Sequence, residues 1–170
     1  MEVVLKTTKI TNIKCSWKIH NIKSKILHQF GNDYPKIRKY NRSFCVVQIK
    51  KFVYTIFWRG HINCTGIRKF SHVKKASNLF LKLMHEWCSL KCVIKKIQID
   101  NISYCGSFHF PISLPKFSKH LKDHKHTYNP EVFPGLSIKI TCGTIVIFQS
   151  GKFIIVCVRK HKHLEKYFPS

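Results

Sequence analysis

An internal repeat constrains the fold of this chain more than any other feature of its sequence. Short stretches recur in one order, first at an offset of 89 residues and then at an offset of 91. The paired positions are Asn12 and Asn101, Phe44 and Phe133, Lys50 and Lys139, Phe57 and Phe148, Gly60 and Gly151, and Arg68 and Arg159. We interpret the chain as two copies of one unit of about 85 residues. The expected domains are residues 1–92 and residues 93–170.

The pattern within each copy predicts a strand, a helix, three or more strands and a final helix. β-Branched residues dominate the runs "FCVVQIKKFVYTIF" and "GLSIKITCGTIVIF", which are typical of paired antiparallel strands. Turns are expected inside these runs at Lys50–Lys51 and Cys142–Gly143, and after them at Gly60 and Gly151. Another strand-like run follows each glycine, so each copy is expected to contain an antiparallel meander.

Apolar residues at helical spacing predict a helix over residues 71–88, with Ser71 as its N-cap. Weaker helical patterns lie near residues 19–30 and 115–125. The corresponding end of the second copy, residues 161–170, is much shorter than the helix of the first copy. We therefore expect an α+β fold in which two antiparallel sheets join edge to edge. Helices would cover one face and leave the other for a partner.

A large excess of positive charge indicates an anionic partner. The chain has 31 Lys and Arg residues against 7 Asp and Glu residues, a formal net charge of +24, and 44% of its residues are hydrophobic, enough for a packed core. So much charge of one sign repels itself unless a partner compensates it. Nucleic acid is the first candidate and an anionic membrane surface the second. No apolar run approaches the ~18 residues of a spanning helix, which disfavours the membrane.

The cysteines and carboxylates form no recognisable catalytic motif. The N-terminus lacks the apolar run of a signal peptide, so the eight cysteines are expected to be reduced. One alternative is a zinc site at His85, Cys88 and Cys92, although no fourth ligand follows at regular spacing. The seven carboxylates are scattered, and nothing singles out a Cys–His nucleophile pair. We therefore expect a protein that is not an enzyme and that holds no cofactor or metal.

Several stretches resemble the TATA-box-binding protein family. They are "YNPEVFPGL", "IVIFQSGKFIIV" and "FHFPISL" in the second copy, and "TNI" and "CTGIRK" in the first. The resemblance covers about residues 6–168 and is stronger in the second copy. It implies a saddle of two pseudo-symmetric repeats, with a curved antiparallel sheet and helices on its convex face. The abundance of Lys, Ile and Asn is typical of an AT-biased genome, such as that of a virus or a parasite.

The resemblance also implies a function, that of a transcription initiation factor. Such a factor binds and bends duplex DNA through an AT-rich minor groove and nucleates a preinitiation complex at promoters. It would act in the nucleus or at the site of viral transcription. In the family, two pairs of phenylalanines are wedged between base steps. By position these pairs are Phe44 with Phe57, and Phe133 with Phe148.

The other implied roles belong to polar side chains and to the groove floor. The family's central asparagines correspond to Asn12 and Asn101, which can donate to the minor-groove acceptors of A·T pairs. The remaining implied DNA contacts are the phosphate-binding Lys50, Lys139 and Lys152 and the floor residues Thr65 and Ile154. The implied contacts for a transcription factor IIB-like factor or an RNA polymerase are Asn129, Glu131 and Val132. The family has an acidic residue where this chain has Asn129.

The chain departs from the family pattern at the groove floor. Where the family has valine beside each asparagine, this chain has Lys14 and Ser103, and another valine position holds Asn63. Val156 stands where a partner of Thr65 is expected. Apolar floor contacts penalise the guanine amino group, so their loss predicts weaker TATA selectivity and sequence-tolerant, salt-sensitive binding. The alternative function is an accessory module of the same fold that binds nucleic acid or protein without wedging DNA.

Overall fold

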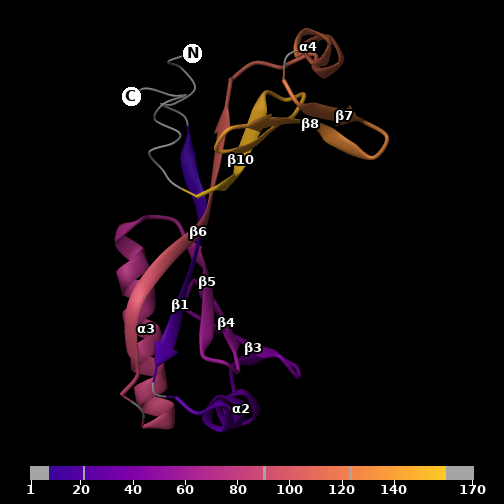
Figure 1. Cartoon of the computed structure of the whole chain (residues 1–170). Helices are drawn as coiled ribbons and strands as arrows, with labels where there is room; N and C mark the ends of the chain where they lie inside the picture. Colours follow the sequence, from indigo (N-terminus) through magenta and orange to yellow (C-terminus); the bar gives the residue numbers. More distant parts are fainter. Residues whose placement is uncertain (1–7, 21, 90, 123, 160–170) are drawn as a thin grey trace. The chain divides into compact units, whose positions relative to one another are not determined.

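The computed structural model describes residues 8–20, 22–89, 91–122 and 124–159 (Figure 1). The chain divides into two compact units. The first unit holds residues 12–100, and the second unit holds residues 1–11 together with residues 101–170. This division differs from the one between the sequence repeats, because the strand that follows residue 92 begins in the first unit and ends in the second. The repeat boundary stays a prediction about the sequence.

The first unit is an antiparallel sheet with two helices. Its elements in chain order are β1 (Lys9–His20), α2 (Ser24–Asp33), β2 (Ile37–Tyr40), β3 (Phe44–Ile49), β4 (Phe52–Phe57), β5 (His61–Ile67), α3 (Ser71–Cys88) and the start of β6 (Val93–Ser107). The strands lie in the order β2-β3-β4-β5-β1-β6. Strands adjacent in the chain from β2 to β5 are also adjacent in the sheet, which is the predicted meander.

The second unit repeats this order of elements. After β6 come α4 (Leu114–His120), β7 (His126–Asn129), β8 (Phe133–Ile140), β9 (Gly143–Ile147) and β10 (Lys152–Val158). Its strands lie in the order β6-β10-β9-β8-β7. The sequence pattern of strand, helix and further strands is therefore confirmed in both copies. The short C-terminal segment at residues 161–170 lies outside the described residues.

One face of the first sheet is buried against α3, which runs alongside β1 and β5 in Figure 1. In β1 the buried apolar residues alternate, at Ile13, Cys15, Trp17 and Ile19, as a half-buried strand requires. Trp17 of β1 packs against Tyr54 of β4 and Phe80 of α3, with ring centroids 6.3 and 5.9 Å away. The Tyr54 hydroxyl donates a hydrogen bond of 2.9 Å to the carbonyl oxygen of Ala76. These contacts hold α3 on one side and leave the opposite face of the sheet uncovered by it.

The core of the second unit is built from the same alternation. Buried apolar side chains from four strands share one face of its sheet: Ile102, Tyr104, Leu136, Ile147, Phe153 and Ile155. The ring of Phe153 lies directly on Gly106 of the neighbouring strand, where a Cβ atom would overlap it. Phe108 packs on the same ring at 5.0 Å between centroids. A larger residue at 106 would therefore expel the central aromatic side chain of this core.

Three boundaries differ from the sequence predictions. The helix over residues 71–88 is confirmed, but Ser71 lies inside it, because Phe70 already has helical dihedral angles (φ −58°, ψ −38°). The helix predicted near residues 19–30 begins at Ser24, since Ile19 continues the buried face of β1. The turn predicted at Cys142–Gly143 comes one residue earlier, because Gly143 pairs with Ile140 and lies against the Val156 carbonyl, where no side chain fits.

The helix predicted near residues 115–125 is α4, which ends at His120. The turns at Lys50–Lys51, Gly60 and Gly151 are confirmed, and both glycines have the positive φ that favours glycine (80° and 79°). Among the described residues, no helix combines the length and the apolar character needed to span a membrane.

The eight cysteines have free thiols that differ in burial. Burial raises the pKa of the Cys45 thiol to about 12, and a hydrogen bond with Cys15 together with burial raises the pKa of Cys64. Since the thiolate is the reacting species, we expect iodoacetamide at pH 8 to label the exposed Cys157 first and Cys45 and Cys64 last. Peptide mass spectrometry over a time course measures the order.

The control is the same labelling in about 8 M urea, a concentration above the unfolding midpoint of most domains. In the unfolded chain every thiol is equally accessible to the reagent. If Cys45 of the native protein is labelled as fast as Cys157, the burial of the Cys45 side chain in β3 is contradicted.

Candidate nucleic-acid interface

The uncovered face of the first sheet carries a row of side chains across four strands. Val46 of β3 pairs with Thr55 of β4, Thr55 pairs with Asn63 of β5, and Asn63 pairs with Ser16 of β1. Their neighbours along each strand point to the buried side, so these four point away from α3. Ser16 donates a hydrogen bond of 3.0 Å to Asp100. A mostly polar row therefore crosses the middle of this face.

The structure brings together each pair of phenylalanines that the resemblance implies. Phe44 and Phe57 are directly opposite in β3 and β4, with ring centroids 5.6 Å apart. Phe133 and Phe148 lie 6.0 Å apart, edge to face at 66°. Phe133 is 45% exposed although it is a large apolar side chain. Each unit thus presents a pair of aromatic rings at one end of its meander, although Phe133 lies two residues before the position opposite Phe148 in the register of β8 with β9.

An asparagine holds the loop before the first ring of each pair. The Asn41 side-chain oxygen accepts hydrogen bonds from the backbone N–H groups of Ser43 (2.8 Å) and Phe44 (2.9 Å). The Asn129 oxygen accepts one from Glu131 at 3.2 Å. These are Asx turns, which fix a short loop by a local side-chain contact. Sequence analysis did not single out Asn41, although the Tyr-Asn pair that "YNRSF" shares with "YNPEVF" was the signal for it.

Further contacts fix the orientation of the rings. A Cβ atom at Gly135 would lie 2.6 Å from Cε1 of Phe133 and 2.8 Å from a methyl group of Val146, so only glycine leaves room for the Phe133 ring. In the first unit, the indole N–H of Trp58 donates to the Asn41 carbonyl at 3.2 Å. The Trp58 ring stacks on His28 of α2 at 4.2 Å between centroids. The loop that carries Phe44 is thereby tied to α2.

The two predicted central asparagines differ in their hydrogen bonds. The Asn12 side-chain oxygen accepts a hydrogen bond of 2.8 Å from the backbone N–H of Gly66. This contact leaves the Asn12 NH₂ group, which only donates, as the part available to a ligand. The Asn101 side-chain oxygen is buried and has no hydrogen-bond partner among the described residues. The counterpart of Gly66 in the repeat is Cys157, which keeps a left-handed φ of 64° despite its side chain.

The remaining predicted residues lie on the strands and turns around these groups. Lys50 occupies the β3–β4 turn with a φ of 53°, and the exposed Lys139 and Lys152 lie on β8 and β10. Thr65 pairs with Val53 on the uncovered face of the first sheet, and Ile154 of β10 is 36% exposed. Beside Phe133, the loop residues Glu131 and Val132 are exposed, and 80% of the Val132 surface is accessible.

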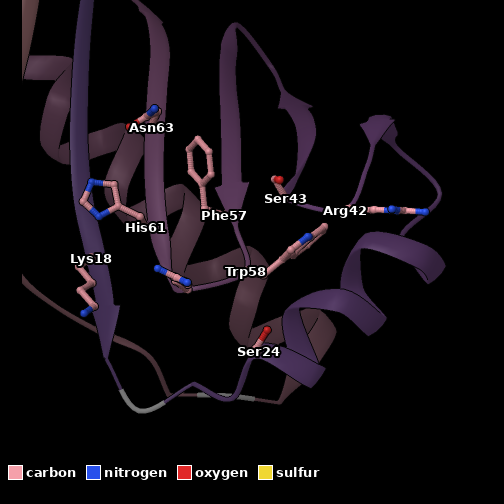
Figure 2. Close-up of a pocket in the computed structure, with 9 residues that line it drawn as sticks. Lys18, Ser24, Arg42, Ser43, Phe57, Trp58, His61 and Asn63 are labelled. Atoms are coloured by element: carbon pink, nitrogen blue, oxygen red, sulfur yellow. The ribbon is translucent and has the colours of Figure 1, made fainter.

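An open cavity surrounds one ring of each phenylalanine pair. The cavity in the first unit measures about 910 Å³ and is lined by four basic side chains, Lys18, Arg42, Arg59 and His61, together with Phe57 and Asn63. Figure 2 shows Phe57 standing between His61 and Asn63 on one side and the loop of Arg42 and Ser43 on the other. The cavity in the second unit measures about 790 Å³ and includes Phe148, Lys152 and Ile154. An anionic group could bind the basic side chains of these cavities, and a flat ring could stack on the phenylalanine.

The candidate zinc ligands do not form a site. Among the described residues, no group of three or more His, Cys, Asp or Glu side chains is placed to hold a metal ion. Burial, followed by the neighbouring Cys92, raises the pKa of the Cys88 thiol to about 11. The described residues therefore give no support to the alternative of a zinc site at His85, Cys88 and Cys92.

Comparison with known proteins finds similarity to the TATA-binding proteins. The family model described as "Transcription factor TFIID (or TATA-binding protein, TBP)" matches residues 96–169. The TATA-box-binding protein of Sulfolobus acidocaldarius is 30% identical over 124 residues, which cover 69% of this chain and 62% of that protein. The TATA-box-binding protein 1 of Triticum aestivum is 29% identical over 106 residues, 59% of this chain and 43% of the relative.

A solved structure shares the fold over most of the chain. The Methanococcus jannaschii TBP superimposes with a TM-score of 0.75 and covers 95% of this chain and 93% of its own, at 23% sequence identity. This chain is therefore similar to TATA-binding proteins in sequence and in fold. The resemblance stated from the sequence and the α+β class are therefore confirmed. The chain spans less than two thirds of the length of these curated TATA-binding proteins.

Proposed function

We propose that this chain is a transcription initiation factor that binds duplex DNA through the minor groove, bends it and nucleates a preinitiation complex at promoters. It acts by binding and not by catalysis, in the nucleus or at the site of viral transcription. The observation that carries the proposal is the pair of contacting phenylalanine rings in each of the two copies of a TATA-binding protein fold.

Electrostatic attraction to phosphates supplies the first step. With a formal charge of +24, the chain attracts any nucleic acid, and each phosphate it neutralises releases counterions from the duplex. Lys50, Lys139 and Lys152 are exposed and lie close to the ends of strands on the uncovered faces. These lysines orient the protein on the backbone, and they read no sequence.

The phenylalanine pairs supply the bend. Unstacking a base step costs roughly a few kcal/mol. An inserted aromatic ring stacks on the exposed bases and offsets part of that cost. Two rings held in contact enter one step as a single wedge, and the duplex kinks away from them. The Asn12 NH₂ group then faces the acceptors of A·T pairs, because its oxygen is already engaged by Gly66.

The loop that carries Phe133 offers a second surface, for a protein partner. Val132 is 80% exposed, beside the exposed Glu131, and their loop is fixed by the Asn129 turn. An ordered loop with one apolar and one acidic side chain suits a basic, partly apolar protein surface. We assign this surface to a transcription factor IIB-like factor or an RNA polymerase.

The direct test measures binding and bending together on one duplex. We expect energy transfer between labels at the two ends of an AT-rich duplex to rise on binding, because a bend shortens the distance between them. The binding constant should fall steeply with salt, with a slope of about −0.9 for each neutralised phosphate. Replacing A·T by inosine·C pairs changes the major groove and keeps the minor-groove acceptors, so binding should survive it.

Two outcomes of this test oppose the proposal. Absence of binding at low salt would reject DNA as the partner. Binding with unchanged energy transfer would favour the accessory module that binds nucleic acid without wedging.

A further inference from the structure

We propose that the first unit accepts a guanine·cytosine pair on its uncovered face through Asn63, whereas Ile154 makes the equivalent face of the second unit reject one. This inference rests on the proposed function, since it takes the two faces to lie on a minor groove. It adds that the two copies read different base pairs, and it names the side chain that makes the difference.

Asn63 and Ile154 occupy the same place in the two copies. They are 91 residues apart, which is the offset of the repeat in this region. Asn63 lies in β5 between Thr55 of β4 and Ser16 of β1. Ile154 lies in β10 between Val146 of β9 and Cys105 of β6. Each is therefore an inner position of its sheet, flanked by a strand on either side.

The surroundings of the two positions differ in chemistry. The row across the first unit is Val46, Thr55, Asn63 and Ser16, and the row across the second is Ser137, Val146, Ile154 and Cys105. The centre of the first row offers amide and hydroxyl groups. The centre of the second is apolar, and Ile154 exposes 36% of its surface there.

The Asn63 amide keeps both its donor and its acceptor available. It is half-exposed, and it makes no hydrogen bond to any residue in the described part of the chain. Asn12 is different, because its oxygen is occupied by the Gly66 N–H and only its NH₂ group is left. Asn63 is therefore able to accept a hydrogen bond from a ligand, whereas Asn12 can only donate one.

Guanine is the base that needs such an acceptor. In the minor groove, A·T pairs in both orientations show only acceptors, and a G·C pair adds the N2 amino donor of guanine. Against Ile154 that amino group loses its water and gains no partner, which disfavours binding. Against Asn63 it donates to the side-chain oxygen. The same amide turns its NH₂ group to an A·T pair, so Asn63 tolerates both.

The cavities place the tolerated pair relative to the wedge. Asn63 lines the cavity that also contains Phe57, and Figure 2 shows the two side chains side by side on neighbouring strands. Ile154 lines the corresponding cavity with Phe148. We therefore expect guanine to be accepted next to the base step that receives Phe44 and Phe57, and rejected next to the step that receives Phe133 and Phe148.

The test compares guanine with inosine, which lacks only the amino group. The reference duplex carries inosine·C pairs at both positions, one in each half of the site, and single or double exchange of inosine for guanine adds amino groups there. Because the protein can bind the duplex in either orientation, it will adopt the one in which a single guanine contacts Asn63. We expect one guanine in either half to weaken binding less than about threefold, and guanine in both halves to weaken it about tenfold.

Two reciprocal variants assign the effect to the named residues. Asn63→Val should lower the affinity for the inosine duplex by a few fold, because it loses the NH₂ donor, and should make a single guanine cost about tenfold relative to that duplex. Ile154→Asn should remove most of the cost of the second guanine. Thermal melts of both variants exclude misfolding, and Asn63→Val suits a strand position. Equal costs for single and double guanine in the parent protein, or no change in Asn63→Val, would overturn the inference.

The reference duplex separates this inference from the proposed function. If the protein fails to bind or bend the inosine duplex, then the minor-groove function itself is wrong. If it binds and bends that duplex but treats every guanine alike, the function stands and the assignment of Asn63 is wrong.

Discussion

A double variant with Phe133→Ala and Phe148→Ala is expected to lose the bend that the second unit induces, which is a large part of the DNA bending of the parent chain. The two rings touch, at 6.0 Å between centroids, so removing both empties the wedge without burying a new polar group. Bending a site of this kind costs on the order of 1–6 kcal/mol, and without inserted rings nothing offsets that cost at this end. Energy transfer between end labels should fall clearly below the value of the parent complex, and only the bend at Phe44 and Phe57 should remain.

Non-specific binding should be much less affected than bending, because the phosphate contacts are intact. The binding constant at low salt should fall by roughly tenfold or less, with an unchanged salt slope. The matched control is Phe110→Ala, which removes the same side chain from a 60% exposed position that belongs to neither pair, where its ring lies 6.0 Å from Phe108. Full bending by the double variant would show that Phe133 and Phe148 are not the wedge.

The largest loss of stability is expected from Phe80→Ala in α3. Phe80 is fully buried and meets Trp17 at 5.9 Å and Tyr54 at 5.4 Å between ring centroids. Truncating a buried phenylalanine costs about 3–5 kcal/mol, against a total stability of roughly 5–15 kcal/mol for a typical domain. Urea unfolding followed by tryptophan fluorescence should show a lower midpoint with an unchanged slope.

The exposed Phe110 again provides the control for stability, since Phe110→Ala should change the free energy of unfolding by only about 0.5 kcal/mol. A similar midpoint for Phe80→Ala and the parent chain would contradict the packing of α3 on the sheet. A fall in the slope would indicate instead that the variant unfolds through an intermediate.

Strand and helix positions followed from local patterns in this sequence. The alternation of apolar residues in β1 and the helical spacing of α3 are properties of a few consecutive residues, and both were predictable. The N-cap at Ser71 was wrong, because a serine before an apolar-periodic run looks the same whether the helix begins at it or one residue earlier. The repeat allowed Phe44 to be paired with Phe133, but the contacts of each ring depend on strands that pair across the sheet.

The hydrogen bonds of the candidate site depended on contacts that no local pattern contains. Asn12 is engaged by Gly66, 54 residues away in the chain, through the pairing of β1 with β5. Asn101 has the same place in the repeat, yet its oxygen has no partner among the described residues, so equal position did not imply equal bonding. The bases that either asparagine reads depend on a ligand as well as on the chain, which is why they remain proposals.

The glycine beneath Phe133 has a consequence for the thermodynamics of association. Because the ring rests on Gly135 and against Phe148, its side-chain torsions are restricted when the protein folds. A partner that receives this ring therefore meets a side chain that has little rotational entropy left to lose. We expect the ring to act as a preorganised anchor, so that affinity at this position depends on the fit of the partner and hardly on ordering the protein.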